Sequence, residues 1–177
     1  NDTRIYFLKI LKKANANIKI NNLKKISGEL VGSITISSSK LKPIVISKDI
    51  GKFIDELPIL FIIAALTKGT SKFKNIGDLK NKESNRLLES KKILVQAGIK
   101  CKITKDAMTI YGKNEIEKQN RTILVKAKGD HRICMSSAIL ALVTGIRTKI
   151  NNFETVNTSF PGFISLMKSL GGKIVIK

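Results

Sequence analysis

The sequence lacks the features that define several large classes of protein. It contains no run of about 18 apolar residues, which a membrane-spanning helix needs, and its longest apolar stretch, 59–66, has the length of a core helix. Cysteine occurs at Cys101 and Cys134 only, and His131 is the single histidine. Two distant cysteines without a CxxC motif exclude a disulfide framework and a zinc site, and one histidine excludes a multi-histidine metal site. We therefore expect no membrane and no metal, in a reduced cytoplasmic setting.

Acidic and aromatic residues are also scarce. Asp and Glu number 13 against 33 Lys and Arg, so the formal net charge is +20, while Trp is absent and aromatic residues make up 5%. This charge favours an anionic partner. Three interpretations stay open: a solvated lysine-rich surface, attraction of small anionic substrates, and a non-catalytic nucleic-acid-binding module. Nucleic-acid surfaces usually add arginine and stacking aromatics, but only five residues are arginine, so we expect no nucleic-acid partner.

The remaining composition is that of one globular α/β domain, with 42% hydrophobic residues in 177. Apolar periodicity and glycine stops predict five helices, over 3–16, 55–68, 84–97, 130–144 and 159–170. Alternating or short apolar runs predict the strands, over 17–20, 28–37, 41–46, 71–76, 99–104, 108–111, 122–126, 148–153 and 173–176. A polar loop is expected over 113–120.

These elements repeat. A helix end, then Gly or Asn, then a strand occurs three times, as KKANANIKI, VQAGIKCKI and KSLGGKIVI. The period of roughly 75–80 residues indicates stacked equivalent units, each of the form β-α-β-α-β-β. We assign 1–40 to the tail of a first unit, 41–112 to a second and 121–177 to a third. Because the first unit lacks its opening strand and helix and residue 1 is Asn, we expect an upstream part to be missing.

Four predicted helix starts carry unusual polar groups. Ordinary capping accounts for acidic and hydroxyl side chains at such places, here Asp55, Ser84, Asp130 and Ser159. It does not account for the cations of the first turns, which oppose the helix dipole, namely Lys82, Arg86, His131 and Arg132. Cations make sense there if an anion is bound as well. Since equivalent helices of a repeat point the same way, we predict one anion-binding face lined with Arg, Lys and two or three carboxylates.

Glu83 and Arg86 are three residues apart and share a helical face. They form either a surface ion pair or a general acid/base beside an anion clamp. In the second case Asp55 and Glu83 would divide the acid and base work. The pattern alone leaves both interpretations open.

At these residues the sequence resembles the 5-enolpyruvylshikimate-3-phosphate synthase (3-phosphoshikimate 1-carboxyvinyltransferase) family. The matching segments stand in the family's order along the whole chain: NDTR, FIDELPIL, NKESNRL, GDHRICMSSAILAL and TSFPGFISLMKSLGG. TSFP resembles the glyphosate-tolerant bacterial branch. The resemblance implies the enolpyruvyl transferase fold, an inside-out α/β barrel domain of β-α-β-α-β-β repeats. Residues 1–177 would be the C-terminal domain only, with the N-terminal domain as its missing partner and a monomer as the complete protein.

The resemblance also implies an activity. The family transfers the enolpyruvyl group of phosphoenolpyruvate to the 5-hydroxyl of shikimate 3-phosphate and releases phosphate, without a cofactor. Asp55 would accept a proton and Glu83 would handle the methylene proton. The implied substrate-binding residues are Arg86 and Arg132 as a phosphoenolpyruvate clamp, Lys82 at shikimate 3-phosphate, and His131 and Thr158 beside them. An enolpyruvyl transferase with another acceptor stays an alternative.

Four residues depart from the family pattern, the first being Asp2, which replaces Pro in the NDTR segment. Asn85 replaces the usual Asp of KESDR, so we expect altered local pairing without loss of activity. Thr158 stands where other branches place a phosphoenolpyruvate-binding Lys. Cys134 replaces a small residue after DHRI, and we expect it to face the helix packing.

Overall fold

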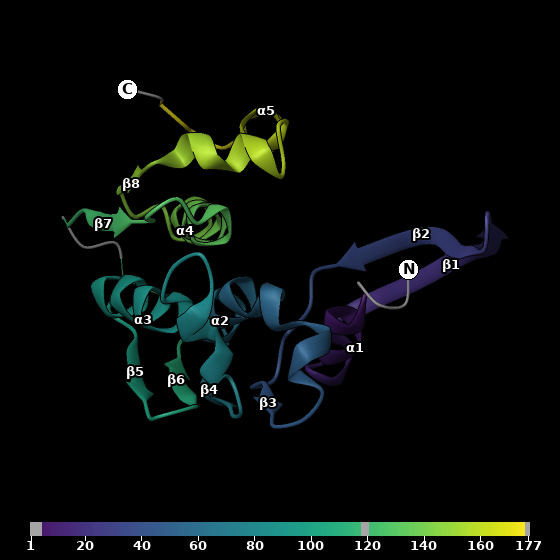
Figure 1. Ribbon diagram of the computed structural model, residues 1–177, viewed down its shortest axis with the longest axis horizontal. Coiled ribbons are helices and arrows are strands. Elements are labelled where there is room, and N and C mark those ends of the chain that lie inside the picture. The colour runs from purple at the N-terminus through teal and green to yellow at the C-terminus, as the bar shows by residue number, and fades with distance from the viewer. Residues whose placement is uncertain (1–4, 118–120, 176–177) are drawn as a thin grey trace.

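The computed structural model describes residues 5–117 and 121–175 and shows a mixed α/β architecture (Figure 1). The α-helices are α1 (Tyr6–Lys13), α2 (Leu57–Ala65), α3 (Arg86–Gln96), α4 (His131–Thr144) and α5 (Phe163–Ser169). The strands are β1 (Asn17–Ile26), β2 (Glu29–Ser37), β3 (Val45–Ile46), β4 (Gly69–Phe73), β5 (Lys100–Ile103), β6 (Met108–Gly112), β7 (Ile123–Lys126) and β8 (Thr148–Asn151). Four 3-10 helices connect them: η1 (Ile50–Lys52), η2 (Ile54–Glu56), η3 (Gly77–Asn81) and η4 (Phe153–Thr158).

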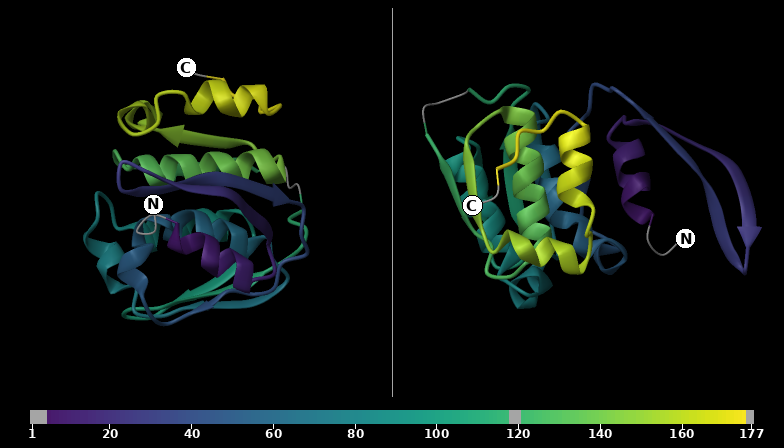
Figure 2. Two further views of the ribbon diagram at one scale, coloured as in Figure 1. Left: turned by 90° about the vertical axis from the view of Figure 1, so that its right-hand side faces the viewer. Right: turned by 90° about the horizontal axis from the view of Figure 1, so that it is seen from above.

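The described strands form three separate sheets and no closed barrel. The largest has four strands in the order β3-β4-β6-β5, with β3 parallel to β4 and the other neighbours antiparallel. The strands β7 and β8 form a parallel pair joined through α4, and β1 and β2 form an antiparallel ribbon. Seen from the side, the four-stranded sheet, the helices α2 and α3, the helix α4 and the helix α5 follow one another through the body (Figure 2).

The centre of this stack is α2, which is apolar around nearly its whole circumference. Seven of its nine residues are buried, including Leu57, Leu60 and Phe61 with no exposed surface. A helix without a polar face must be covered on all sides, and α2 packs against α3, α4 and β6. Its burial holds the residues just before it, including Asp55, at a fixed place. Within the described residues, no helix has the length and apolarity that a bilayer crossing requires.

The ribbon β1–β2 projects away from this body, with α1 lying between the two (Figure 1). Of the nineteen residues in its two strands, only Ile18 is buried, and every residue of β2 is exposed. The register pairs Asn17 with Ser37 and shifts between Asn21 and Lys24, which marks a bulge. The expected strand over 17–20 is therefore longer than predicted.

Several expected boundaries are wrong, each for a local reason. The strand expected over 41–46 is reduced to β3, because Pro43 cannot donate a ladder hydrogen bond. The helix expected from Ser159 begins only at Phe163, after η4 and the Pro161–Gly162 turn. No strand forms over 173–175, and residue 176 lies outside the described residues. The NDTR segment and the loop residues 118–120 also lie outside them.

Candidate active site

Arg86, the first residue of α3, stands at the centre of the polar cluster that the helix starts form. Its side chain is 1% exposed, yet its guanidinium donates to three carboxylates on three parts of the chain. Nε donates to Asp130 Oδ2 at 2.8 Å, Nη1 donates to Asp55 Oδ1 at 2.9 Å, and Nη2 donates to Glu83 Oε2. Charge-assisted hydrogen bonds of this kind are the strong ones, so Arg86 joins η2, α3 and the start of α4.

Arg132, in the first turn of α4, also contacts Asp55. Its Nη1 donates to the Asp55 backbone oxygen at 2.9 Å, and its Nη2 lies 3.7 Å from Asp55 Oδ2. Glu56 Oε1 lies 3.6 Å from Nη1 of the same guanidinium. Lys82 Nζ completes the group at 3.2 Å from Asp55 Oδ1. Asp55 therefore has contacts with all three cations of the cluster.

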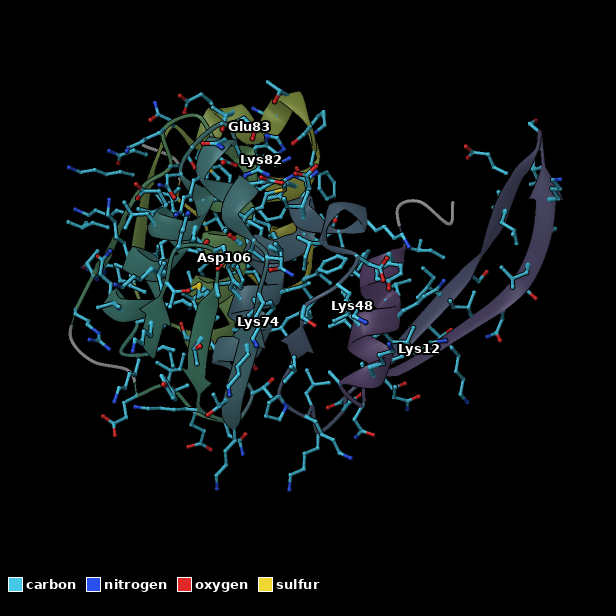
Figure 3. All side chains as sticks on the ribbon, turned by 60° about the horizontal axis from the view of Figure 1, so that its bottom comes forward. Lys12, Lys48, Lys74, Lys82, Glu83 and Asp106 are labelled. Atoms are coloured by element: carbon cyan, nitrogen blue, oxygen red, sulfur yellow. The ribbon has the colours of Figure 1, made fainter. Side chains whose placement is uncertain are left out.

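The carboxylates of the cluster differ in their access to water. Asp130 has no exposed surface, whereas the side chains of Asp55 and Glu83 are 32% and 51% exposed. Figure 3 shows Lys82 and Glu83 beside one another at one end of the packed body. The exposed members lie where a ligand from solvent can reach them, while Asp130 lies beneath Arg86.

Electrostatics keep the two aspartates ionised. Burial by itself would raise the pKa of Asp55, but the hydrogen bond from Lys82 and the charges of Arg132, Lys82 and Arg86 bring it below its ordinary value. For Asp130, burial likewise acts to raise the pKa, and the hydrogen bond and charge of Arg86 more than offset it. At neutral pH Asp55 is therefore a carboxylate that can accept a proton.

The cluster combines the cations Lys82, Arg86 and Arg132 with four carboxylates, those of Asp55, Glu56, Glu83 and Asp130. The predicted face of Arg, Lys and two or three carboxylates thus has one carboxylate more than expected. An anion can bind the buried guanidinium of Arg86 by taking the place of the carboxylates that occupy Nη1 and Nη2 now, whereas the Arg132 side chain is 28% exposed and its carboxylate contacts are longer. No group of three or more His, Cys, Asp or Glu residues that could hold a metal ion occurs among the described residues.

Two predicted site residues do not join the cluster in this structure. His131 is partly exposed, and within residues 5–117 and 121–175 its side chain makes no hydrogen bond or ion pair. Thr158 is exposed at the end of η4, where its hydroxyl donates to the Thr155 backbone oxygen at 2.8 Å. Both residues are accessible to solvent, so neither is held in a fixed orientation by the site.

The capping assignments were correct at one helix and wrong at three. Asp130 caps α4, with Oδ1 accepting from the backbone N–H groups of Arg132 and Ile133. The cap of α3 is Asn85, whose side chain accepts from Leu88 N at 3.0 Å, and not Ser84. No side-chain oxygen caps α2 or α5, which follow Glu56 and Gly162.

Sequence reasoning missed three members of the site. Ser84, taken for a cap, donates from its hydroxyl to Asp130 Oδ2 at 2.9 Å. For Asp130 the sequence predicts a cap alone, and Glu56 is absent from the predicted residues. The capping signal of Asp130 is local and visible in the sequence, whereas its contact with Arg86 spans 44 residues, and no local pattern reports such a contact.

Comparisons with known proteins show the family of the chain. The model of the family described as EPSP synthase (3-phosphoshikimate 1-carboxyvinyltransferase) matches residues 1–167. The chain belongs to the EPSP synthase family. A 3-phosphoshikimate 1-carboxyvinyltransferase of Campylobacter jejuni subsp. doylei is 38% identical over 174 residues, which are 98% of this chain and 39% of that protein. One of Clostridium tetani is 36% identical over 169 residues, 95% of this chain and 38% of that protein.

Solved structures extend the likeness to three dimensions. An EPSP synthase structure from Acinetobacter baumannii matches all of this chain and 41% of its own, with a TM-score of 0.88 and 33% identity. The enolpyruvyl transferase NikO from Streptomyces tendae matches 94% of this chain with a TM-score of 0.68 and 14% identity, a likeness of fold alone. The enolpyruvyl transferase fold expected from the sequence is confirmed. The chain spans about 39% of the length of the curated EPSP synthases that it matches.

Proposed function

We propose that this chain supplies the C-terminal half of an active site that transfers the enolpyruvyl group of phosphoenolpyruvate to the 5-hydroxyl of shikimate 3-phosphate and releases phosphate. The observation that carries the proposal is the convergence on Asp55 of Arg86 at the start of α3, Arg132 at the start of α4 and Lys82 in the loop before α3. Membership of the EPSP synthase family supplies the reaction class. The other half of the site would come from an N-terminal domain of the same protein, and the complete enzyme would be a cytoplasmic monomer.

The proposed domain organisation follows the order of the elements. Residues 41–112 run in the order β3, α2, β4, α3, β5, β6, which is the full β-α-β-α-β-β unit. Residues 1–40 provide α1, β1 and β2, the order of the second half of that unit. Residues 121–177 provide β7, α4, β8 and α5, the order of its first part. This order supports three units in one C-terminal domain.

Substrate binding in this proposal proceeds by exchange of anions. Arg86 Nη1 and Nη2 now donate to Asp55 and Glu83, and the oxygens of phosphoenolpyruvate would take their place, with Arg132 as the second half of the clamp. Planar guanidinium groups suit such bidentate contacts. Lys82 would then contact shikimate 3-phosphate, and His131 would support the site.

Asp55 and Glu83 are the proposed proton-handling groups. Asp55 is ionised in the resting enzyme, as an acceptor for the hydroxyl proton of shikimate 3-phosphate must be. Its lowered pKa makes it a weak base while Lys82, Arg86 and Arg132 hold it, and it would become a stronger one when substrate anions draw these cations away. Glu83, half exposed and held only through Arg86 Nη2, is free to turn towards the methylene carbon once phosphoenolpyruvate occupies that nitrogen. Such positioned acid–base groups typically contribute about 10²–10⁴-fold to a rate.

Thr158 is the residue on which we base the assignment to a branch of the family. It occupies the TSFP position where other branches have a lysine, and it lies exposed at the end of η4. A hydroxyl there offers phosphoenolpyruvate no positive charge. We therefore place the chain with the glyphosate-tolerant bacterial branch, and inhibition of the complete enzyme by glyphosate, compared with its Thr158→Lys variant, tests that placement.

Phosphate release tests the function directly. The reaction is measured with phosphoenolpyruvate, with and without shikimate 3-phosphate, on this chain and on the gene product extended upstream by a domain's length. Release by the extended protein alone, dependent on shikimate 3-phosphate, is the expected result. No release from either folded protein would overturn the proposal. Release that depends on a different hydroxyl compound would instead support a transferase with another acceptor.

Glu83→Gln in the extended protein tests the assigned proton transfer. The amide keeps the shape of the side chain but cannot donate or accept the methylene proton, so we expect kcat to fall by roughly 10²–10⁴-fold. Glu115→Gln, which changes an exposed loop carboxylate, is the matched control and should leave kcat unchanged. Near-parental turnover in Glu83→Gln would exclude the proposed role of Glu83.

A further inference from the structure

The N–H donors of Arg86 fall into two groups that differ in burial. Nη1 and Nη2 donate to Asp55 and Glu83, whose side chains are 32% and 51% exposed and can turn into solvent. Nε donates to Asp130, which has no exposed surface. A fully buried carboxylate cannot leave its partner without leaving an uncompensated charge inside the protein. The Nε contact is therefore the one that persists when a ligand displaces the others.

Asp130 uses both carboxylate oxygens, and each serves a different helix. Oδ2 accepts from Arg86 Nε at 2.8 Å and from the Ser84 hydroxyl at 2.9 Å, both at the start of α3. Oδ1 accepts from the backbone nitrogens of Arg132 at 3.0 Å and Ile133 at 3.4 Å, both in the first turn of α4. One side chain thus joins the beginnings of the two helices that present the cations.

This arrangement defines which edge of the guanidinium is open to a ligand. Because Nε donates to the buried Asp130, the Nη1–Nη2 edge of Arg86 faces the more exposed carboxylates of Asp55 and Glu83. A bidentate anion can bind at that edge. The hydrogen bond that Arg132 N donates to Asp130 Oδ1 fixes the start of α4, the helix that carries the second guanidinium. The relative placement of the two arginines therefore depends on Asp130.

We infer that Asp130, assisted by the Ser84 hydroxyl, is a positioning residue that holds the two guanidinium groups of Arg86 and Arg132 in register for one bidentate anion. The inference rests on the proposed function, because phosphoenolpyruvate is the anion. Asp130 itself does not touch the substrate. Misplacement of a clamp by about 1 Å can cost on the order of 10²-fold in rate.

Asp130→Asn is the direct test, since its amide can still cap α4 through the oxygen while it presents N–H groups to Arg86 Nε. In this 177-residue chain, labelled with ¹⁵N-arginine, at most five Nε–H resonances occur, and Arg86→Lys identifies the one that belongs to Arg86. We expect a slowly exchanging Arg86 Nε–H signal in the parent that is lost in Asp130→Asn. An unchanged signal would overturn the inference, whatever the enzyme's activity.

The second measurement uses the upstream-extended protein and phosphoenolpyruvate. We expect kcat/KM for phosphoenolpyruvate to fall on the order of 10²-fold in Asp130→Asn, mainly through a higher KM, with a smaller change in kcat and in the KM for shikimate 3-phosphate. An unchanged KM for phosphoenolpyruvate would overturn the inference. If the parent itself releases no phosphate, the proposed function fails, and the Nε–H signal still decides whether Asp130 positions Arg86.

Glu89→Gln is the matched control. Glu89 lies on α3 and, like Asp130, is a buried carboxylate. Its Oε1 is 3.1 Å from Lys92 Nζ and 3.4 Å from the Nζ of Lys128, a residue that precedes α4. Its removal should leave the Arg86 Nε–H signal and the KM for phosphoenolpyruvate unchanged. A loss equal to that of Asp130→Asn would show that removing any buried carboxylate near the starts of α3 and α4 has this effect, and would overturn the assignment.

Ser84→Ala provides a milder variant if Asp130→Asn does not fold. It removes one hydrogen bond to Oδ2 and leaves the charge in place. One hydrogen bond corresponds to roughly a 2- to 10-fold effect, so we expect a rise of that size in the KM for phosphoenolpyruvate and faster exchange of Arg86 Nε–H. Parental values for both would contradict the inference.

Discussion

Arg86 is the largest side chain that the described fold buries completely. Moving a guanidinium out of water is costly, and three carboxylates are needed to compensate it. Replacing a buried ion pair by apolar residues of similar volume is often neutral or even stabilising. Stability is therefore a weak reason to keep this charge at the start of α3, and its partially exposed partners indicate a binding function.

The depressed pKa of Asp130 predicts how stability depends on pH. Burial opposes ionisation, but Arg86 and Ser84 hold the pKa below its ordinary value of 3.8. The folded state then binds the proton more weakly than the unfolded state, so the stabilisation is fully present above about pH 5 and is lost as the pH falls below 3.8. Urea unfolding should show a steeper loss of free energy between pH 5 and low pH in the parent than in Asp130→Asn. Parallel curves would contradict the assigned pKa shift.

The cationic residues of the site could be predicted from the sequence, but the carboxylates that each of them contacts could not. Cations in first turns of helices were a visible anomaly, because the helix dipole disfavours them. Which carboxylate meets which nitrogen of Arg86 depends on contacts with Asp55 and Asp130 across 31 and 44 residues. The burial of Cys134 was correctly expected from its place in the packing of α4, and burial raises its pKa to about 11.

Among the elements, prediction succeeded where both ends of a helix carry strong local signals. The helix α4 begins after its Asp130 cap and ends at Gly145, whose φ of 68° favours glycine. It failed at α5, where Ser159 looked like a cap but the chain first forms η4 and a Pro161–Gly162 turn. It also failed for β1, whose lysine-rich continuation beyond residue 20 has no apolar alternation. Pairing with β2 extends that strand, and pairing is not local.

The contact between α2 and β6 makes Gly112 an element-scale test. A Cβ at Gly112 would meet the backbone oxygens of Ala64 and Thr67 at the end of α2. Neither carbonyl can move freely, since Lys113 N donates to the neighbouring Ala65 oxygen at 2.9 Å. We therefore expect Gly112→Ala to lower the free energy of unfolding by about 1–3 kcal/mol or more, measured by urea or thermal unfolding.

Gly51→Ala is the control for that substitution. Gly51 has no heavy atom within 4 Å of its ideal Cβ position, so its free energy of unfolding should change by about 0.5 kcal/mol or less. Equal effects of the two substitutions would show that steric conflict at the end of α2 is not what requires glycine at 112.

At the scale of the whole molecule, two features are the positions of the lysines and the exposed ribbon β1–β2. Figure 3 shows Lys82 at the candidate site, whereas Lys12 on α1 and Lys48 near that helix lie far from it. Part of the net charge of +20 therefore lies outside the site. The shape is uneven as well, because the ribbon β1–β2 carries exposed apolar side chains outside the main body (Figure 1), those of Val31, Ile34 and Ile36 among them.

The ribbon should be the least stable part of this chain. A two-stranded hairpin alone is marginally stable in water, and only Ile18 of β1–β2 is buried. The strands β4 and β6, by contrast, lie inside a four-stranded sheet covered by α2. Since local opening requires little free energy where few apolar contacts are lost, hydrogen–deuterium exchange of this chain should be much faster in β1–β2 than in β4–β6.

The same exchange experiment on the upstream-extended protein tests what the exposed face of the ribbon is for. If added polypeptide covers Ile34 and Ile36, exchange in β1–β2 should slow towards that of β4–β6, while β4–β6 itself changes little. Equal protection of both sheets in the 177-residue chain would contradict the expected instability. Unchanged fast exchange in the extended protein would show that the upstream part does not cover the ribbon.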